Sequence, residues 1–187
     1  MEHWQLASQP SAHRVFERSL TVGTVEELEQ LRGYTQITGH LTIRSAVLKD
    51  LSPLCNLSSI LGSLSIVGCH QLQGLKGLEH LEFVGEGILL SNNARLEHLA
   101  AFRGLRRVGN NIIIMGNPKL ESLRGFWGLT GRLKQLSIRG NHALVNLQGL
   151  GGIKSIELLS VQHNDQLESL EGLDHLKSIG EYLRIRA

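Results

Sequence analysis

The chain has 187 residues, of which 41% are hydrophobic and 19% charged, so it can bury enough apolar surface to fold as one globular domain. Its net charge of +2 gives no electrostatic reason to expect a nucleic-acid partner. No apolar stretch reaches the length of a membrane span or of a signal peptide. We therefore expect no membrane insertion by this chain, and its compartment stays open.

The first elements that the sequence predicts are an N-terminal arm over residues 1–20 and a single solenoid domain over residues 21–187. At the start of the domain, Thr24 followed by Glu27 is typical of a capping box. Leu28 and Leu31 place an apolar stripe on one helix face, and Gly33 supplies a stop signal. The sequence therefore predicts a short capping helix over residues 24–32, which would cover the N-terminal end of the core.

A repeat occupies the rest of the chain, in which leucine fills 35 positions and glycine 21. Coils begin at residues 41, 64, 88, 112, 136 and 159, with a partial coil from 183, at intervals of 23 or 24 residues. The copy from Leu64 is apolar at positions 1, 3, 9, 12, 15, 18 and 21. Positions 1 and 3 alternate as in a short strand, and the later spacing of three favours tight turns. We expect a mainly β, leucine-rich-repeat-like solenoid of about six 24-residue coils, each burying its apolar residues against its neighbours.

Position 6 of the repeat, directly after each strand, is polar in successive copies. A side-chain amide at that place can hydrogen-bond the turns of its own coil and of the adjacent coil, which predicts a structural asparagine ladder. The cysteine at the same position one copy earlier is expected to be a small buried substitute rather than a reactive thiol. The ladder residues are Cys69, Asn93, Asn117, Asn141 and Asn164.

The stretch EELEQLRGYTQITGHLTI, followed by the pattern L-x-I-x-x-N-x-x-L-x-x-L-x-G-L, resembles the receptor L domain over about residues 21–187. That family forms the ligand-binding lobes of insulin-receptor and epidermal-growth-factor-receptor proteins and occurs in fungal cell-wall proteins. The resemblance implies a right-handed parallel β-helix that binds ligand on its sheet face, and an extracellular or cell-surface setting. Tyr34 stands where receptor members usually carry a cysteine, and this departure from the family pattern argues against a secreted, disulfide-bonded setting, so a bacterial or intracellular relative fits as well as a receptor fragment.

Strand positions 2 and 4 point away from the core, so the sequence can be used to list the side chains of the outer face. The residues at these positions on neighbouring strands predict one contiguous apolar patch with an arginine rim, and such patches often mark binding sites. We therefore expect a non-enzymatic recognition module that binds a protein or a glycan on this face. The predicted site consists of Val67, Leu89, Ile113 and Met115, with Arg44 and Arg139 at the rim.

Other functions remain open at this stage. One alternative is a structural spacer that self-associates through the sheet face or through the uncapped coil that begins at Leu183. A second is a carbohydrate-active β-helix enzyme, against which stands the absence of clustered Asp, Lys and Arg. No nucleophile motif or paired-carboxylate signature appears and the nine histidines are scattered, so we expect no catalytic residue, metal site or cofactor. Trp127 lies off the core and either contacts a partner or glycan or packs against its own turn.

Overall fold

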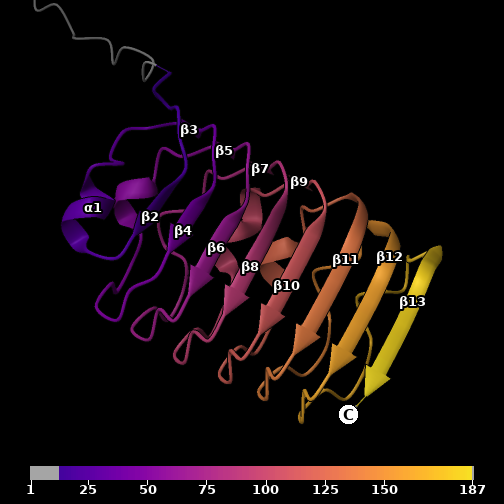
Figure 1. The fold of residues 1–187 in the computed structure, drawn as a ribbon. Helices are drawn as coiled ribbons and strands as arrows, with labels where there is room; N and C mark the ends of the chain where they lie inside the picture. Colours follow the sequence, from indigo (N-terminus) through magenta and orange to yellow (C-terminus); the bar gives the residue numbers. More distant parts are fainter. Residues whose placement is uncertain (1–12, 187) are drawn as a thin grey trace, which may run out of the picture.

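The computed structural model describes residues 13–186, which form a parallel β-solenoid of about seven turns (Figure 1). Every strand pair within the two sheets is parallel, because each coil returns the chain to the same side of the stack. The larger sheet contains, in spatial order, β2 (Leu20–Val22), β4 (Leu41–Ile43), β6 (Leu64–Val67), β8 (Gly87–Ser91), β10 (Asn111–Met115), β11 (Gly131–Arg139), β12 (Ile153–Gln162) and β13 (Ser178–Arg186). The smaller sheet contains β1 (Val15–Phe16), β3 (Gln36–Ile37), β5 (Ser59–Ile60), β7 (Phe83–Val84) and β9 (Arg107–Val108).

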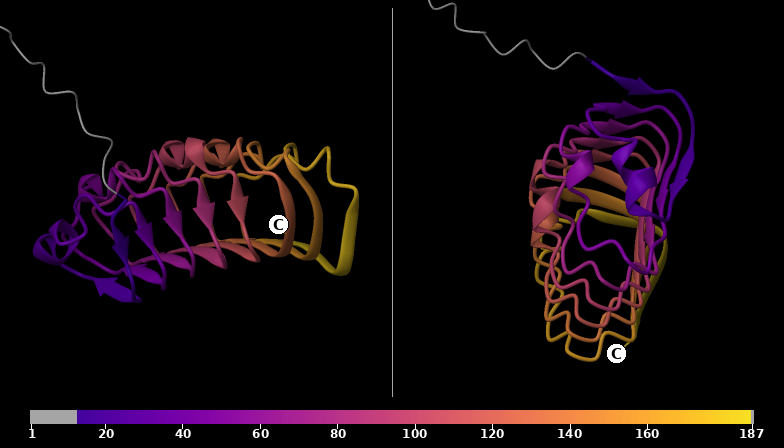
Figure 2. Two further views of the ribbon diagram at one scale, coloured as in Figure 1. Left: turned by 90° about the horizontal axis from the view of Figure 1, so that it is seen from above. Right: turned by 90° about the vertical axis from the view of Figure 1, so that its left-hand side faces the viewer.

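Short helices form the wall of the solenoid that lies opposite the larger sheet (Figure 2, left). They are the α-helix α1 (Val25–Glu29) and the 3-10 helices η1 (Ser52–Leu54), η2 (Ala100–Gly104) and η3 (Arg124–Phe126). Seen along the axis, the coils superpose and enclose a single core (Figure 2, right). The predicted class, a mainly β parallel solenoid with a spacing of about 24 residues, is confirmed.

The repeat positions that the sequence marks as apolar line this core. In the coil from Leu64, all seven of them are fully buried: Leu64, Ile66, Leu72, Leu75, Leu78, Leu81 and Val84. Strand register stacks equivalent residues, so that Ile66 lies beside Ile43 on one side and Leu90 on the other. A coil alone would leave these side chains in water, so burial of apolar surface between neighbouring coils stabilises the stack.

The N-terminal end differs from the expectation in two ways. Strand β1 pairs with β3 and β2 pairs with β4, so residues 15–20, expected to be part of an arm, already belong to the solenoid. Residues 1–12 of that arm lie outside the described residues. Helix α1 is shorter than the range 24–32, although Thr24 and Glu27 do form the capping box. Leu31 is buried beyond its end, and the chain turns at Gly33 with a φ of +80°.

Candidate functional site

Two rows of outward-facing side chains cross the larger sheet, and we call them the outer sheet face; a further outward row precedes them and includes Asn111, Gln135, Leu158 and Tyr182. Register pairing sets Leu89 on β8 beside Ile113 on β10, and Met115 on β10 beside Arg139 on β11. Alternate residues of a strand point to the same side, so the residues between those of the rows enter the core. The first row is Thr42, Ser65, Leu89, Ile113, Ser137, Ser160 and Arg184, and the second is Val67, Ser91, Met115, Arg139, Gln162 and Arg186.

The apolar part of the outer sheet face is more compact than the sequence suggests. Leu89 and Ile113 are half-buried neighbours, and Met115, two residues further along β10, is 37% exposed. Val67 is half-buried, and the buried Ser91 separates it from Met115 in the second row. Leu89, Ile113 and Met115 therefore form the apolar centre, and Val67 lies at its edge.

Arginine side chains flank the apolar centre. Arg139 is exposed beside Met115, and Arg44, the residue that follows β4, is exposed toward the N-terminal end. Arg184 and Arg186 continue the two rows on β13. None of the residues that form the two rows is acidic, so the charged side chains of these rows are all positive.

The position-6 asparagines form a continuous chain of hydrogen bonds inside the turns that follow the larger sheet. Asn117 is in the middle of it. Its Oδ1 accepts from the backbone N–H and from Nδ2 of Asn93, at 3.1 and 3.0 Å. Its Nδ2 donates to Oδ1 of Asn141 at 3.1 Å and to the carbonyl oxygen of Leu90 at 3.1 Å. Asn141 is joined to Asn164 in the same way, so each amide satisfies backbone groups of two coils.

Cys69 and Ser45 extend this chain toward the N-terminus. The backbone N–H of Cys69 donates to Oδ1 of Asn93 at 2.9 Å, and the Cys69 sulfur lies 3.5 Å from the carbonyl oxygen of Ile43. Burial raises the pKa of the Cys69 thiol, which keeps it neutral. The buried Ser45 donates from Oγ to the carbonyl oxygen of Gly23 at 2.7 Å. The repeat count does not identify Ser45 as a member of the ladder. Its coil has 23 residues instead of 24, so Ser45 falls at position 5 rather than position 6.

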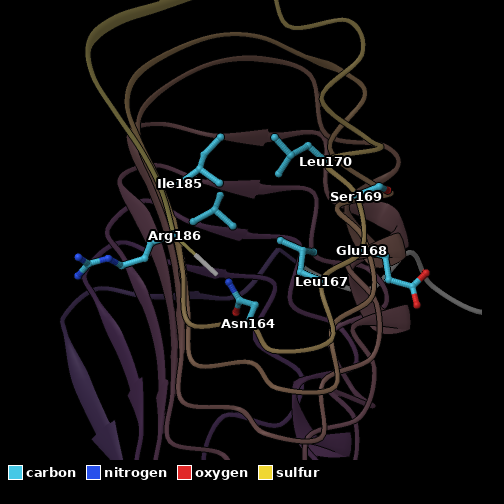
Figure 3. A pocket seen from close by; sticks show the side chains of 8 residues that line it. Asn164, Leu167, Glu168, Ser169, Leu170, Ile185 and Arg186 are labelled. Carbon is cyan, nitrogen blue, oxygen red and sulfur yellow. The ribbon is translucent and has the colours of Figure 1, made fainter.

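Within residues 13–186, no further strand or helix covers the coil that contains β13. A cavity of about 160 Å³ lies there between β13 and the preceding turns, lined among others by Val161, Asn164, Leu170 and Ile185. Figure 3 shows Ile185 and Leu170 facing each other across this cavity, whereas Arg186 points outward. Ile185 is 50% exposed, although equivalent residues of inner coils are fully buried. The last coil therefore leaves core-type side chains in contact with solvent.

The histidines and carboxylates do not converge anywhere in the described chain. Within residues 13–186, no group of three or more His, Cys, Asp or Glu side chains is placed to hold a metal ion. His142 contacts Asp165 at 2.8 Å, at an exposed turn, as an isolated pair. No helix of residues 13–186 has the length and apolar character to cross a membrane.

The chain was compared with protein-family models, curated proteins and solved structures, and none of them matches it. The structure itself assigns the chain to the parallel β-solenoids.

Proposed function

We propose that this chain is a non-enzymatic recognition module of the receptor L type, which binds a protein ligand on its outer sheet face. The observation that supports this proposal is the apolar centre formed by Leu89, Ile113 and Met115 between flanking arginines. The core is complete without these side chains, since the inward residues of the same strands, such as Ile112 and Ile114, are fully buried. Apolar residues that pack no core and lie among arginines are typical of protein interfaces.

A protein fits this face better than a glycan does. The two rows contain no aromatic side chain on which a sugar ring could stack, since the exposed Tyr182 lies outside them on the last strand, and their apolar centre lies on regular strands rather than in a hollow. A flat surface whose apolar centre loses its water on contact, and whose rim is charged, suits binding to another protein. Because the rows carry arginines and no carboxylate, we expect the partner surface to be acidic around an apolar contact.

The experiment compares capture of proteins from an extract and from the culture medium of the source cells. The baits are the unmodified chain, Ile113→Asp and the control Val145→Asp, which places the same charge at another exposed apolar residue. The proposal requires a partner that the unmodified chain and Val145→Asp enrich and that Ile113→Asp loses by tenfold or more. The purified partner must then show the same ranking in a direct binding titration. If no enriched protein depends on Ile113, the outer sheet face is not the binding surface.

The coil that contains β13 supports a second candidate, self-association. Leu183 and Ile185 on β13 are 54% and 50% exposed, and the outer edge of β13 pairs with no strand in residues 13–186. At the opposite end, Val22 and Leu28 are buried, so the two ends are not alike. Exposed strand edges with apolar side chains tend to pair with another chain.

Sedimentation velocity over a range of protein concentrations tests this candidate. Self-association through β13 predicts a sedimentation coefficient that rises with concentration and that Leu183→Lys returns to the monomer value. Ile113→Asp leaves the rise unchanged in that case, which separates the two surfaces. A sedimentation coefficient that is constant from about 1 to 500 μM would exclude self-association as the function.

A further inference from the structure

A hollow on the helical wall lies on the opposite side of the solenoid from the outer sheet face. It has a volume of about 380 Å³, within the range of small-ligand sites. It lies against η2 and η3, which are neighbours along the wall (Figure 2, left). Its lining residues are His98, Leu99, Ala100, Arg103, Ser122, Arg124, Gly125 and Trp127.

Trp127 is 66% exposed beside this hollow. The neighbouring Phe126 is fully buried and stacks on Phe102 at 5.5 Å between ring centroids, so it supplies the aromatic packing of this wall. The Trp127 side chain therefore does not contribute to the core. An exposed indole is a flat apolar surface with a polar N–H at its edge, which suits a ligand that has both apolar and polar faces.

Two arginines line the hollow together with the indole. The Arg124 guanidinium lies 5.6 Å from the Trp127 ring, and its Nε and Nη2 donate to Oε1 of Gln148 at 3.1 and 2.7 Å. Arg103 also lines the hollow, and it makes no ion pair within residues 13–186. None of the described residues that line the hollow is acidic. An anionic group would therefore be attracted to it, and a guanidinium can bind a carboxylate through two parallel hydrogen bonds.

Two polar side chains at the hollow are held in place. The backbone N–H of Arg124 donates to Oγ of Ser122 at 3.1 Å, which leaves the hydroxyl proton free to donate. The His98 ring lies directly against the α-carbon of Gly74, where a β-carbon would overlap it. Hydroxyl and imidazole groups beside an exposed indole can hydrogen-bond the hydroxyls of a sugar.

We propose that this hollow, which we name the Trp127 site, binds an acidic oligosaccharide. A uronic acid ring stacks on the free face of Trp127, and its carboxylate pairs with Arg103, with Arg124 adding positive charge. Ser122 and His98 bond its hydroxyls. The Trp127 site is separate from the outer sheet face, so a failure of the protein-binding proposal would not affect it.

Tryptophan fluorescence reports directly on this site. The chain has two tryptophans, so Trp4→Phe leaves Trp127 as the one indole emitter. Titration of this variant with trigalacturonic acid is expected to change the emission in a saturable way, with a dissociation constant in the millimolar range or below. Neutral galactotriose should bind at least tenfold more weakly, because it has no carboxylate. Raising the salt concentration should weaken the binding of the acid.

Substitutions then assign the contacts by calorimetric titration. Trp127→Ala should abolish binding, and Arg103→Gln should weaken it at least tenfold. The control Arg95→Gln removes an exposed arginine that is bonded to Gln71 in another turn, and it should leave affinity unchanged. Circular dichroism checks that each variant keeps its fold. The proposal is overturned if the acid gives no saturable signal up to 10 mM, if the neutral sugar binds equally well, or if Arg103→Gln behaves like Arg95→Gln.

Discussion

Nδ2 of Asn117 donates to Oδ1 of Asn141, one coil further along, at 3.1 Å, and the same nitrogen also contacts the carbonyl oxygen of Leu90 in the preceding coil. One amide thus links three coils. Since apolar contacts are nondirectional, such bonds specify how far each coil turns relative to the next.

We predict that Asn117→Ala lowers the free energy of unfolding by about 1 to 3 kcal/mol, because it leaves buried donors and acceptors without partners. Asn164→Ala should cost less, since Asn164 is the last member of the chain of amides and borders the cavity beside β13. Urea unfolding followed by circular dichroism measures both. Equal losses of unfolding free energy at the two positions would mean that an asparagine contributes the same stability whether or not another member of the ladder follows it.

A second prediction concerns the close approach of two coils at Gly109. An added β-carbon there would overlap the carbonyl oxygen of Gly85 in the preceding coil, so Gly109→Ala must push two backbones apart. We expect a loss of stability on the order of 3 kcal/mol.

Gly68→Ala is the matched control for Gly109→Ala. Gly68 has a φ of +66°, and no atom lies within 4 Å of the position that an added β-carbon would take. The substitution therefore costs the left-handed backbone strain alone, about 1 kcal/mol. The difference between the two urea midpoints measures the contact between coils. If Gly68→Ala were the more damaging change, backbone conformation rather than coil spacing would determine where glycine is needed.

The repeat phase alone is enough to predict which residues face inward, because burial of one apolar stripe per coil leaves little choice. It also predicts the neighbours of an outward residue where the spacing is regular, since 24 residues separate Val67, Ser91 and Met115, and the strand register pairs them in that order. The repeat count misses Ser45, because a shortened coil does not show where it lost a residue. The Trp127 hollow depends on the packing of η2 against η3, which the repeat pattern does not encode.

A third prediction concerns the two thiols. Cys55 is exposed and Cys69 is buried, and neither forms a disulfide. A thiol reagent at pH 8 should therefore modify one group quickly in the folded chain and two in denaturant. Cys55→Ser should remove the fast group, and a reductant should leave the unfolding transition unchanged. Fast modification of both thiols in the folded chain would show that the turn around Cys69 opens readily.

The last prediction follows from the buried thiol at the start of the asparagine ladder. Burial raises the pKa of Cys69 in the folded chain, whereas an unfolded cysteine ionises near pH 8.5. Below about pH 8 the thiol is neutral in both states, so its contribution to stability does not depend on pH. Above about pH 8.5 the unfolded chain loses the proton and the folded chain keeps it, which favours unfolding.

The free energy of unfolding should therefore fall by about 1.4 kcal/mol for each pH unit above 8.5, until the pKa of the folded state is reached. Other groups also titrate in this range, so the measurement is a difference between two variants. Cys55→Ser provides the background, and Cys69→Ala within that background removes the titrating thiol. The stability advantage of the parent over Cys69→Ala should be constant from pH 6 to 8 and shrink from pH 8.5 to 10. An advantage that stays constant up to pH 10 would mean that Cys69 ionises equally in both states, and that water reaches the ladder at this end.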